Sequence, residues 1–406
     1  MQTLQPNDKN ELASIIRDAK GENVRLEIIG SGSKRAIGRP VEANYRVSSA
    51  QMSGITLYQP KQRMLSVKAG THLDVIEDAL EKYQQILGFE PVNLGGILNT
   101  REKPETIGGI LATNISGSRQ IHTGSAKNHL LSLRGVNGFG QIINAGGDTI
   151  KHVTGYDLRR ALTGTWGTLV FMTDITLRTL PKPEQTQTLI FSGLLDVLAI
   201  ELMNKAMATP YEISGAMHLQ APLVKNLTTE QNRATGQSLT ALRLENFSFS
   251  TPCRMQKLQD LLGPFGDHII LDDDESHDFW SDMRTLKFFH NSKGPLWRIA
   301  AAPNMASEIV SAIKSHHPES IAAYDCAGGI IWLQTPLRSD AGASEVHRAV
   351  LNRGGNATLI RADKELRSNT YVFQPVDTQI KSLMKRIKMA FDPFGILNPG
   401  RIYEDI

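Results

Sequence analysis

The chain has 406 residues, more than one ordinary hydrophobic core holds, so its length favours at least two domains. Its 44 lysines and arginines nearly balance its 41 aspartates and glutamates, and no stripe of basic residues stands out, which argues against a nucleic-acid partner. Only two cysteines, Cys253 and Cys326, are present, so a disulfide framework is not expected and the chain alone cannot ligate an iron–sulfur cluster, which takes about four thiolates.

The sequence carries no clear targeting or membrane signal. Its first ten residues lack the basic flank and the apolar segment of a secretory signal. The longest apolar-leaning segment, 189–202, is interrupted by Asp196 and is shorter than the ~20 residues that span a bilayer. We therefore expect a cytoplasmic protein without a transmembrane segment. Peripheral attachment at the inner face of the membrane, through partner proteins, stays open.

The first 182 residues combine short strands and helices with many glycines. Apolar residues at helical spacing predict an opening helix, and alternating apolar residues before Gly30 predict a strand. Two further strands flank Pro60 and are expected to pair as a hairpin. In chain order, the predicted helices cover 7–20 and 71–83, and the predicted strands cover 24–29, 55–58, 64–67, 131–136, 141–144 and 169–177.

The pattern of predicted strands and helices changes after Pro181-Lys182-Pro183, where we place a domain boundary. From 183 to 390 strands and helices alternate, which predicts an α+β sheet covered on one face. The segment 391–406 begins with a run of turn signals and is expected to return to the first domain, so the expected division is 1–182, 183–390 and 391–406. After the boundary, the predicted strands cover 212–219, 240–247, 296–301, 321–324, 330–334 and 357–361, and the predicted helices 255–262, 305–314 and 344–351.

The segment Gly30–Lys34, with the sequence Gly-Ser-Gly-Ser-Lys, follows the first apolar strand. It is not a Rossmann fingerprint, because Arg35 stands where the third glycine should be and Pro40 argues against the helix that such a unit needs. A loop whose backbone N–H groups converge on a pyrophosphate needs no helix. Taken alone, the segment is equally compatible with a tight turn between strands.

A second segment rich in glycine and small residues runs from Thr106 to Gly117. Small residues there either allow two chain segments to cross closely or place a planar cofactor against the backbone, with Thr106, Thr113 and Ser116 as hydrogen-bonding groups. Two such segments in one domain favour one extended ligand that is gripped along its length. A dinucleotide is the first candidate.

Several motifs together resemble one known family. Six segments resemble the FAD-binding domain of the vanillyl-alcohol-oxidase/PCMH superfamily. They are Gly30–Lys34, Ala69–Thr71, Phe89–Pro91, Thr106–Gly109, Gly155–Asp157 and Gly164–Thr168. Within this superfamily, the chain resembles the E-type FAD-binding subunits of glycolate oxidase (glycolate dehydrogenase), through segments 136–138, 146–147, 155–160, 296–299, 324–329, 354–359 and 391–403. This resemblance covers nearly the whole chain. It implies an α+β fold, in which a PCMH-type two-lobed FAD-binding domain is followed by an α+β antiparallel-sheet cap domain.

The resemblance implies one FAD molecule along both glycine-rich segments. It places the pyrophosphate at Gly30–Lys34, the flavin near 123–125 and the adenine end at 167–170. Lys127 and His152 depart from the family pattern, and Lys127 lacks the planar fork of an arginine. No histidine stands in the first loop, where some relatives attach flavin covalently, so non-covalent FAD is expected. The implied FAD-binding residues are Gly30, Ser31, Gly32, Ser33, Lys34, Pro91, Thr106, Gly108, Gly109, Asn114, Ser116, Gly117, Thr123, Gly124, Ser125, Gly167, Thr168 and Val170.

The implied function is that of the FAD-binding subunit of a glycolate oxidase complex, which oxidises the small 2-hydroxy acid glycolate to glyoxylate. The implied partners are a catalytic flavoprotein subunit and an iron–sulfur subunit that receives the electrons. The chain lacks the histidine-rich segment of the catalytic subunit, which favours a stabilising or electron-relaying flavin over direct oxidation of substrate. No catalytic residue is assigned. The alternative is a stand-alone FAD-dependent oxidase of a sugar lactone or alcohol.

Other candidate residues favour structural interpretations. The eleven histidines include the adjacent pair His316-His317, which is expected to be a solvated helix end, but no His-x-His or His-x-x-x-His motif with a nearby acidic partner, so no metal site is expected. Arg298 either pairs with a substrate carboxylate or forms a salt bridge between domains or subunits, and we favour the salt bridge. Cys326 is expected to be a small buried thiol. The acidic run Asp272–Glu275 is expected to be a solvated loop.

Overall fold

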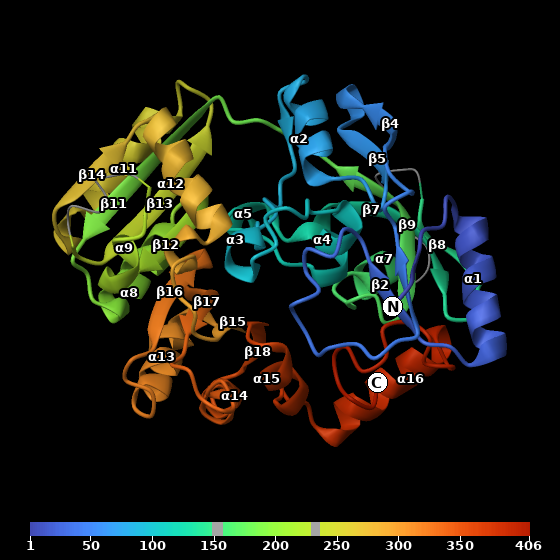
Figure 1. The fold of residues 1–406 in the computed structure, drawn as a ribbon. Coiled ribbons are helices and arrows are strands. Elements are labelled where there is room, and N and C mark those ends of the chain that lie inside the picture. Colours follow the sequence, from blue (N-terminus) through green and yellow to red (C-terminus); the bar gives the residue numbers. More distant parts are fainter. Residues whose placement is uncertain (148–156, 229–235) are drawn as a thin grey trace.

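A computed structural model describes residues 1–147, 157–228 and 236–406 of the chain. Two bodies lie side by side, the first domain on the right of Figure 1 and the cap domain on the left. Helices α3 (Gly95–Leu98), α4 (Ile107–Thr113) and α5 (Gln120–Thr123) lie where the two bodies meet. Two sequence predictions, the departure at His152 and the Gly155-Tyr156 part of a family motif, lie outside the described residues.

The first domain has two lobes, each built on its own sheet. In the smaller lobe, strands in the order β1-β3-β2 run parallel beside helix α1, which Asp8 caps by accepting hydrogen bonds from the backbone N–H groups of Asn10 and Glu11. In the larger lobe, five antiparallel strands have the order β4-β5-β9-β7-β8. The bounds are β1 Thr3–Leu4, α1 Lys9–Glu22, β2 Leu26–Ile29, β3 Tyr45–Ser48, β4 Ile55–Gln59, β5 Met64–Lys68, α2 Leu73–Glu81, β6 Gln85–Ile86, α6 Ala126–His129, β7 Leu130–Asn137, β8 Ile142–Gly146, α7 Leu158–Leu162, β9 Val170–Arg178 and β10 Leu180–Pro181.

The cap domain is built on one antiparallel sheet of eight strands, in the order β14-β11-β13-β12-β16-β17-β15-β18. Its helices flank the sheet in Figure 1. The strands are β11 Gln185–Ser192, β12 Ile213–Leu219, β13 Leu239–Asn246, β14 His268–Leu271, β15 Leu296–Ala301, β16 Ile321–Asp325, β17 Ile330–Gln334 and β18 Gly355–Arg361. The helices are α8 Asp196–Met207, α9 Ala221–Val224, α11 Thr251–Leu262, α12 Asp273–Thr285, α13 Ala306–Lys314, α14 Ala343–Leu351 and α15 Lys364–Asn369.

The cap sheet buries both of its faces. Neighbouring residues of β15 point to opposite sides of the sheet. Trp297 therefore packs with the residues of α8, α11, α13 and α14, whereas Leu296 shares a core with α12 and with Ile97 and Ile115 of the first domain. The prediction of a sheet covered on one face is too simple, because the first domain and α12 cover the second face. This contact sets the cap sheet directly against the first domain.

The chain returns to the first domain at helix α16 (Thr378–Phe391), earlier than the predicted residue 391. The buried ammonium group of Lys388 donates hydrogen bonds to the carbonyl oxygens of Thr168 (2.7 Å) and Leu397 (3.0 Å) and to Asp392 (2.8 Å). Leu397 in turn forms a β-bridge with Leu26. The last residues therefore run beside the first lobe, where Figure 1 shows α16 below the N-terminal strands.

The prediction that Asp272–Glu275 form a solvated loop is wrong, because these residues begin a helix. Asp272 and Glu275 form a capping box that begins α12, in which each side chain accepts the backbone N–H of the other residue (3.0 and 3.2 Å). Carboxylates in a first helical turn stabilise the helix dipole, so an acidic run before an apolar stretch begins a helix. Within the described ranges, every helix is too short or too polar to cross a membrane.

Candidate functional site

The loop Gly30–Lys34 touches the start of α4. A Cβ on Gly30 would lie 2.1 Å from the Oγ1 atom of Thr106, so only glycine allows this contact. Gly32 has a φ of +85°, a conformation that glycine adopts without strain. Two residues of the first glycine-rich segment are therefore needed for the shape of the loop itself.

This loop presents hydrogen-bond donors without acceptors. Among the described residues, none accepts from the backbone N–H groups of Ser31, Gly32, Ser33 or Lys34. The buried Oγ atom of Ser31 has no partner either. Buried polar groups in folded proteins are nearly always paired, and successive N–H groups of this kind form anion-binding concavities. The loop is therefore built to receive an anion.

The charge behind the loop comes from Arg401 and not from Lys34. Lys34 is buried in an ion pair with Glu105, which cancels its charge. The guanidinium of Arg401 donates to the carbonyl oxygens of Lys34 (3.1 Å), Arg35 (3.3 Å) and Arg39 (3.2 Å) and forms no ion pair with any described carboxylate. Burial lowers the pKa of Arg401 to about 10, so the group stays protonated at neutral pH. Arg401 thus supplies an unbalanced positive charge next to the free N–H groups.

Three adjoining cavities form one groove through this region. The first, about 80 Å³, lies between the lobes and is bordered by Gly167 and Val170. The second, about 70 Å³, follows the loop Gly30–Lys34. The third, about 220 Å³, reaches the cap sheet at Arg298. Trp166 borders all three cavities, so one extended ligand can follow the groove from the first lobe to the cap domain.

Ten of the eighteen predicted cofactor residues border this groove, and eight do not. Asn114 accepts the backbone N–H of Lys127 (3.2 Å), and Ser116 accepts that of Ala126 (3.1 Å). The Thr123 hydroxyl donates to the carbonyl oxygen of Gly88 (2.6 Å), so these side chains hold the chain in place. The residues on the walls are Gly30, Ser31, Gly32, Ser33, Lys34, Thr106, Gly108, Gly109, Gly167 and Val170; those elsewhere are Asn114, Ser116, Gly117, Thr123, Gly124, Ser125 and Thr168, with Pro91 in another cavity.

Two residues of the C-terminal segment complete the groove and were not predicted. Asn398 accepts the backbone N–H of Ile28 (2.7 Å) and donates to the carbonyl oxygen of Trp166 (2.8 Å). It joins the segments on the two sides of the groove, next to Arg401. The turn signals of the tail predicted its return, but nothing in the sequence indicated which of its side chains would reach the groove.

The salt bridge between domains favoured for Arg298 is not formed with any described residue, and a salt bridge to another subunit stays a prediction. The side chain of Arg298 forms no ion pair or hydrogen bond with any described residue, and its Nε atom is buried without a partner. Its guanidinium carbon lies 5.9 Å from the centre of the Trp332 ring. Burial lowers the pKa of Arg298. By contrast, Cys326 is buried as predicted, and burial raises the pKa of its thiol.

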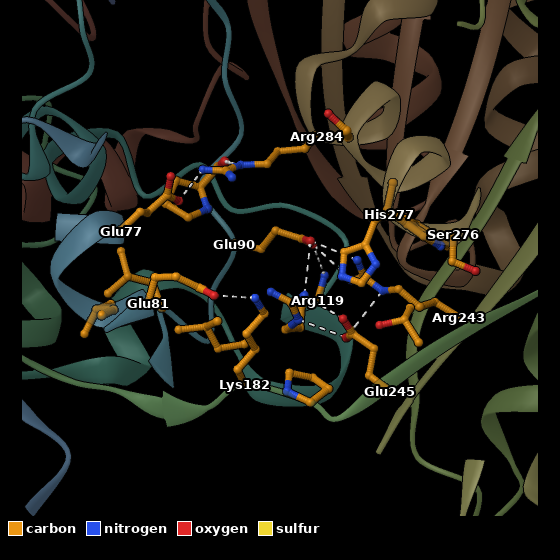
Figure 2. Close-up of a pocket in the computed structure, with 18 of the residues that line it drawn as sticks. Glu77, Glu81, Glu90, Arg119, Lys182, Arg243, Glu245, Ser276, His277 and Arg284 are labelled. Atoms are coloured by element: carbon orange, nitrogen blue, oxygen red, sulfur yellow. Dashed lines mark hydrogen bonds and ion pairs between the residues drawn. The ribbon is translucent and has the colours of Figure 1, made fainter. Parts of the chain in front are cut away.

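A second, larger cavity, about 320 Å³, lies between the domains and contains four linked charged groups (Figure 2). This ion-pair quartet joins Glu90 and Arg119 of the first domain to Arg243 and Glu245 on β13. The nitrogen–oxygen distances are 2.9 Å for Arg243–Glu90, 2.7 Å for Arg119–Glu245, 3.4 Å for Arg243–Glu245 and 3.6 Å for Arg119–Glu90. Burial alone would raise the pKa of Glu90, but the two arginines outweigh it and lower the pKa to about 2. Every charged group of the quartet has an ion partner, so the quartet stabilises the contact between the two domains.

The comparisons with known proteins agree with this geometry. The "FAD binding domain" family matches residues 2–146. Glycolate oxidase subunit GlcE of Escherichia coli K12 is 28% identical over 395 residues, which cover 96% of each chain. D-lactate dehydrogenase of Archaeoglobus fulgidus is 31% identical over 180 residues, which cover 44% of this chain and 38% of the relative. The crystal structure of p-cresol methylhydroxylase with substrate bound superimposes with a TM-score of 0.76 at 13% identity and covers 99% of this chain and 88% of that one.

The structural neighbour shows the fold, and the family match shows similarity to an FAD-binding domain over residues 2–146. The α+β architecture expected from the sequence, an FAD-binding domain followed by an antiparallel cap, is confirmed. The chain therefore has the PCMH-type FAD-binding fold, and among the FAD-linked oxidoreductases it is similar over nearly its whole length to glycolate oxidase subunit GlcE.

Proposed function

We propose that this chain is the FAD-binding subunit of a complex that oxidises a small 2-hydroxy acid, glycolate, to glyoxylate. The whole-length similarity to a glycolate oxidase subunit supports this activity. A D-lactate dehydrogenase and a D-2-hydroxyglutarate dehydrogenase are further relatives, and by name both act on 2-hydroxy acids. The shared chemistry of these relatives is the oxidation of a carbon that carries a hydroxyl group next to a carboxylate.

The observation that carries the proposal is the row of unpaired backbone N–H groups from Ser31 to Lys34. These groups and the free Ser31 hydroxyl fit the pyrophosphate of FAD, and Arg401 balances its charge. From this loop the groove continues toward Val170 on one side and past Trp166 toward the cap sheet on the other, so it offers room for an extended ligand. When bound, FAD accepts a hydride and releases electrons singly. The protein then has to hold the cofactor, exclude water and orient the substrate.

The electrons require an acceptor outside this chain. An iron–sulfur cluster takes about four thiolates, and the chain has two cysteines, of which Cys326 is buried and Cys253 is exposed. We therefore propose an iron–sulfur subunit and a second, catalytic flavoprotein subunit as partners. We propose that the complex lies in the cytoplasm and attaches to the inner face of the membrane through those partners.

The test begins with the absorbance spectrum of the purified chain. We expect a yellow protein that releases FAD on denaturation, which would establish non-covalent binding. Anaerobic addition of glycolate should bleach the flavin when the partner subunits are present. A colourless chain that takes up no added FAD refutes the proposal. Turnover of a sugar lactone or an alcohol with oxygen, by the chain alone, would favour the stand-alone oxidase.

A further inference from the structure

Arg298 lies on the face of the cap sheet that packs against the first domain. In the register of the cap sheet it lies directly opposite Trp332 on β17 and Thr358 on β18, and directly opposed residues share a face. Leu296 and Ile360 on the same face belong to the core that packs against the first domain. A guanidinium in such surroundings is costly unless an anion compensates its charge.

No described carboxylate bonds directly to the Arg298 side chain. Asp325 attracts Arg298 through space, but its carboxylate accepts the backbone N–H of Cys326 at 2.6 Å and does not bond to Arg298. The side chains of Thr358 and Asn356 also lack hydrogen-bond partners among the described residues. All three side chains border the cap end of the groove, so unpaired polar groups converge on one cavity.

We propose that Arg298 and Thr358 bind the carboxylate and the 2-hydroxyl group of a small 2-hydroxy acid at the cap end of the groove. The planar guanidinium can donate two parallel hydrogen bonds to a carboxylate, and a threonine hydroxyl can donate to or accept from a second hydroxyl. The cavity of about 220 Å³ is smaller than the ~300–1,000 Å³ of sites for drug-sized ligands, which suits a small acid. This inference rests on the proposed function, and it makes the chain a substrate-binding subunit as well as an electron relay.

The test is calorimetric titration of the FAD-loaded chain with oxalate, a carboxylate that the flavin does not oxidise. Arg298→Gln should weaken oxalate binding by about 10- to 100-fold, because a charge-assisted bidentate contact is lost. Arg298→Lys keeps the positive charge but lacks the planar fork of the guanidinium. Its affinity for oxalate should lie between that of the wild type and that of Arg298→Gln. Thr358→Val should weaken binding by about 5-fold. Arg386→Gln, which changes an exposed arginine of α16 without an ion pair to any described residue, is the matched control and should bind like the wild type.

The outcomes separate this inference from the proposed function. Flavin absorbance of each variant reports whether FAD is bound, and circular dichroism reports whether the variant is folded. If the chain takes up no FAD, the proposed function fails, and the same titration is made on the FAD-free chain. Wild-type protein that binds no oxalate, or Arg298→Gln that binds it equally well, overturns the inference. Loss of FAD affinity in Arg298→Gln with unchanged oxalate binding also overturns it, since Arg298 would then serve the cofactor.

Discussion

Removal of one carboxylate from the ion-pair quartet should loosen the junction of the two domains. Glu90→Gln keeps the shape of the side chain but leaves Arg119 and Arg243 with only Glu245 for two guanidinium groups. The pKa of Glu90 is about 2, against an ordinary value of 4.5. Because a tenfold change in proton affinity is worth about 1.4 kcal/mol, this difference corresponds to about 3 kcal/mol of stability at neutral pH. Breaking a buried ion pair typically costs ~3–5 kcal/mol, so the two arguments agree.

The assay is urea unfolding, followed by circular dichroism and tryptophan fluorescence, at several pH values. A carboxylate whose pKa is lowered by folding contributes stability above its unfolded value and loses it as the pH falls toward the folded value. The wild type should therefore lose Glu90's contribution between about pH 5 and pH 2, whereas Glu90→Gln should lack this part of the pH dependence. Glu201→Gln, at an exposed position of α8, is the control and should change little. A loss below about 1 kcal/mol, or an unchanged pH profile, would refute the reasoning.

Three further substitutions test the groove and the C-terminal return. Gly30→Ala should cut FAD affinity more than about 10-fold, because its Cβ would collide with Thr106, whereas Gly21→Ala, with open space around it, should leave binding intact; equal flavin content in both variants would contradict this. Arg401→Gln should weaken FAD binding by about 10- to 100-fold in a fluorescence titration, and a change below about 2-fold would show that its charge does not act on the cofactor. Lys388→Met should lower the free energy of unfolding by about 3 kcal/mol in urea, because Asp392 is left buried without its ion partner, and a wild-type midpoint would count against the contact.

Local patterns predicted most elements, and tertiary contacts decided the rest. Alternating apolar residues located β2, β7 and β9 within a few residues. Segment 107–113 is a helix despite two glycines, because Gly108 lets it pack on the backbone of Ala69, where a Cβ would lie 2.8 Å from the carbonyl oxygen. Gly117 likewise allows close approach to Glu90, so close chain crossing explains these two glycines, while Gly109 borders the groove.

Tertiary contacts also decided which residues of the candidate site could be predicted from the sequence. The loop Gly30–Lys34 was recognisable because its glycines and serines are consecutive in the chain. Arg401 and Arg298 were not assignable, because each lies far from the loop in sequence and its partners are set by the assembled domains. The absence of a partner for Arg298 is a property of the packed cap face, which no local pattern of residues reports.

The order in which the groove is built bears on how the protein acquires its cofactor. A ribosome makes the glycine loops early, the cap sheet next and Asn398 and Arg401 after both. The segments of Ile28 and Trp166 lie on the two sides of the groove. Asn398 joins them by hydrogen bonds, and it is added near the end of translation. We therefore expect flavin capture to follow translation of nearly the whole chain.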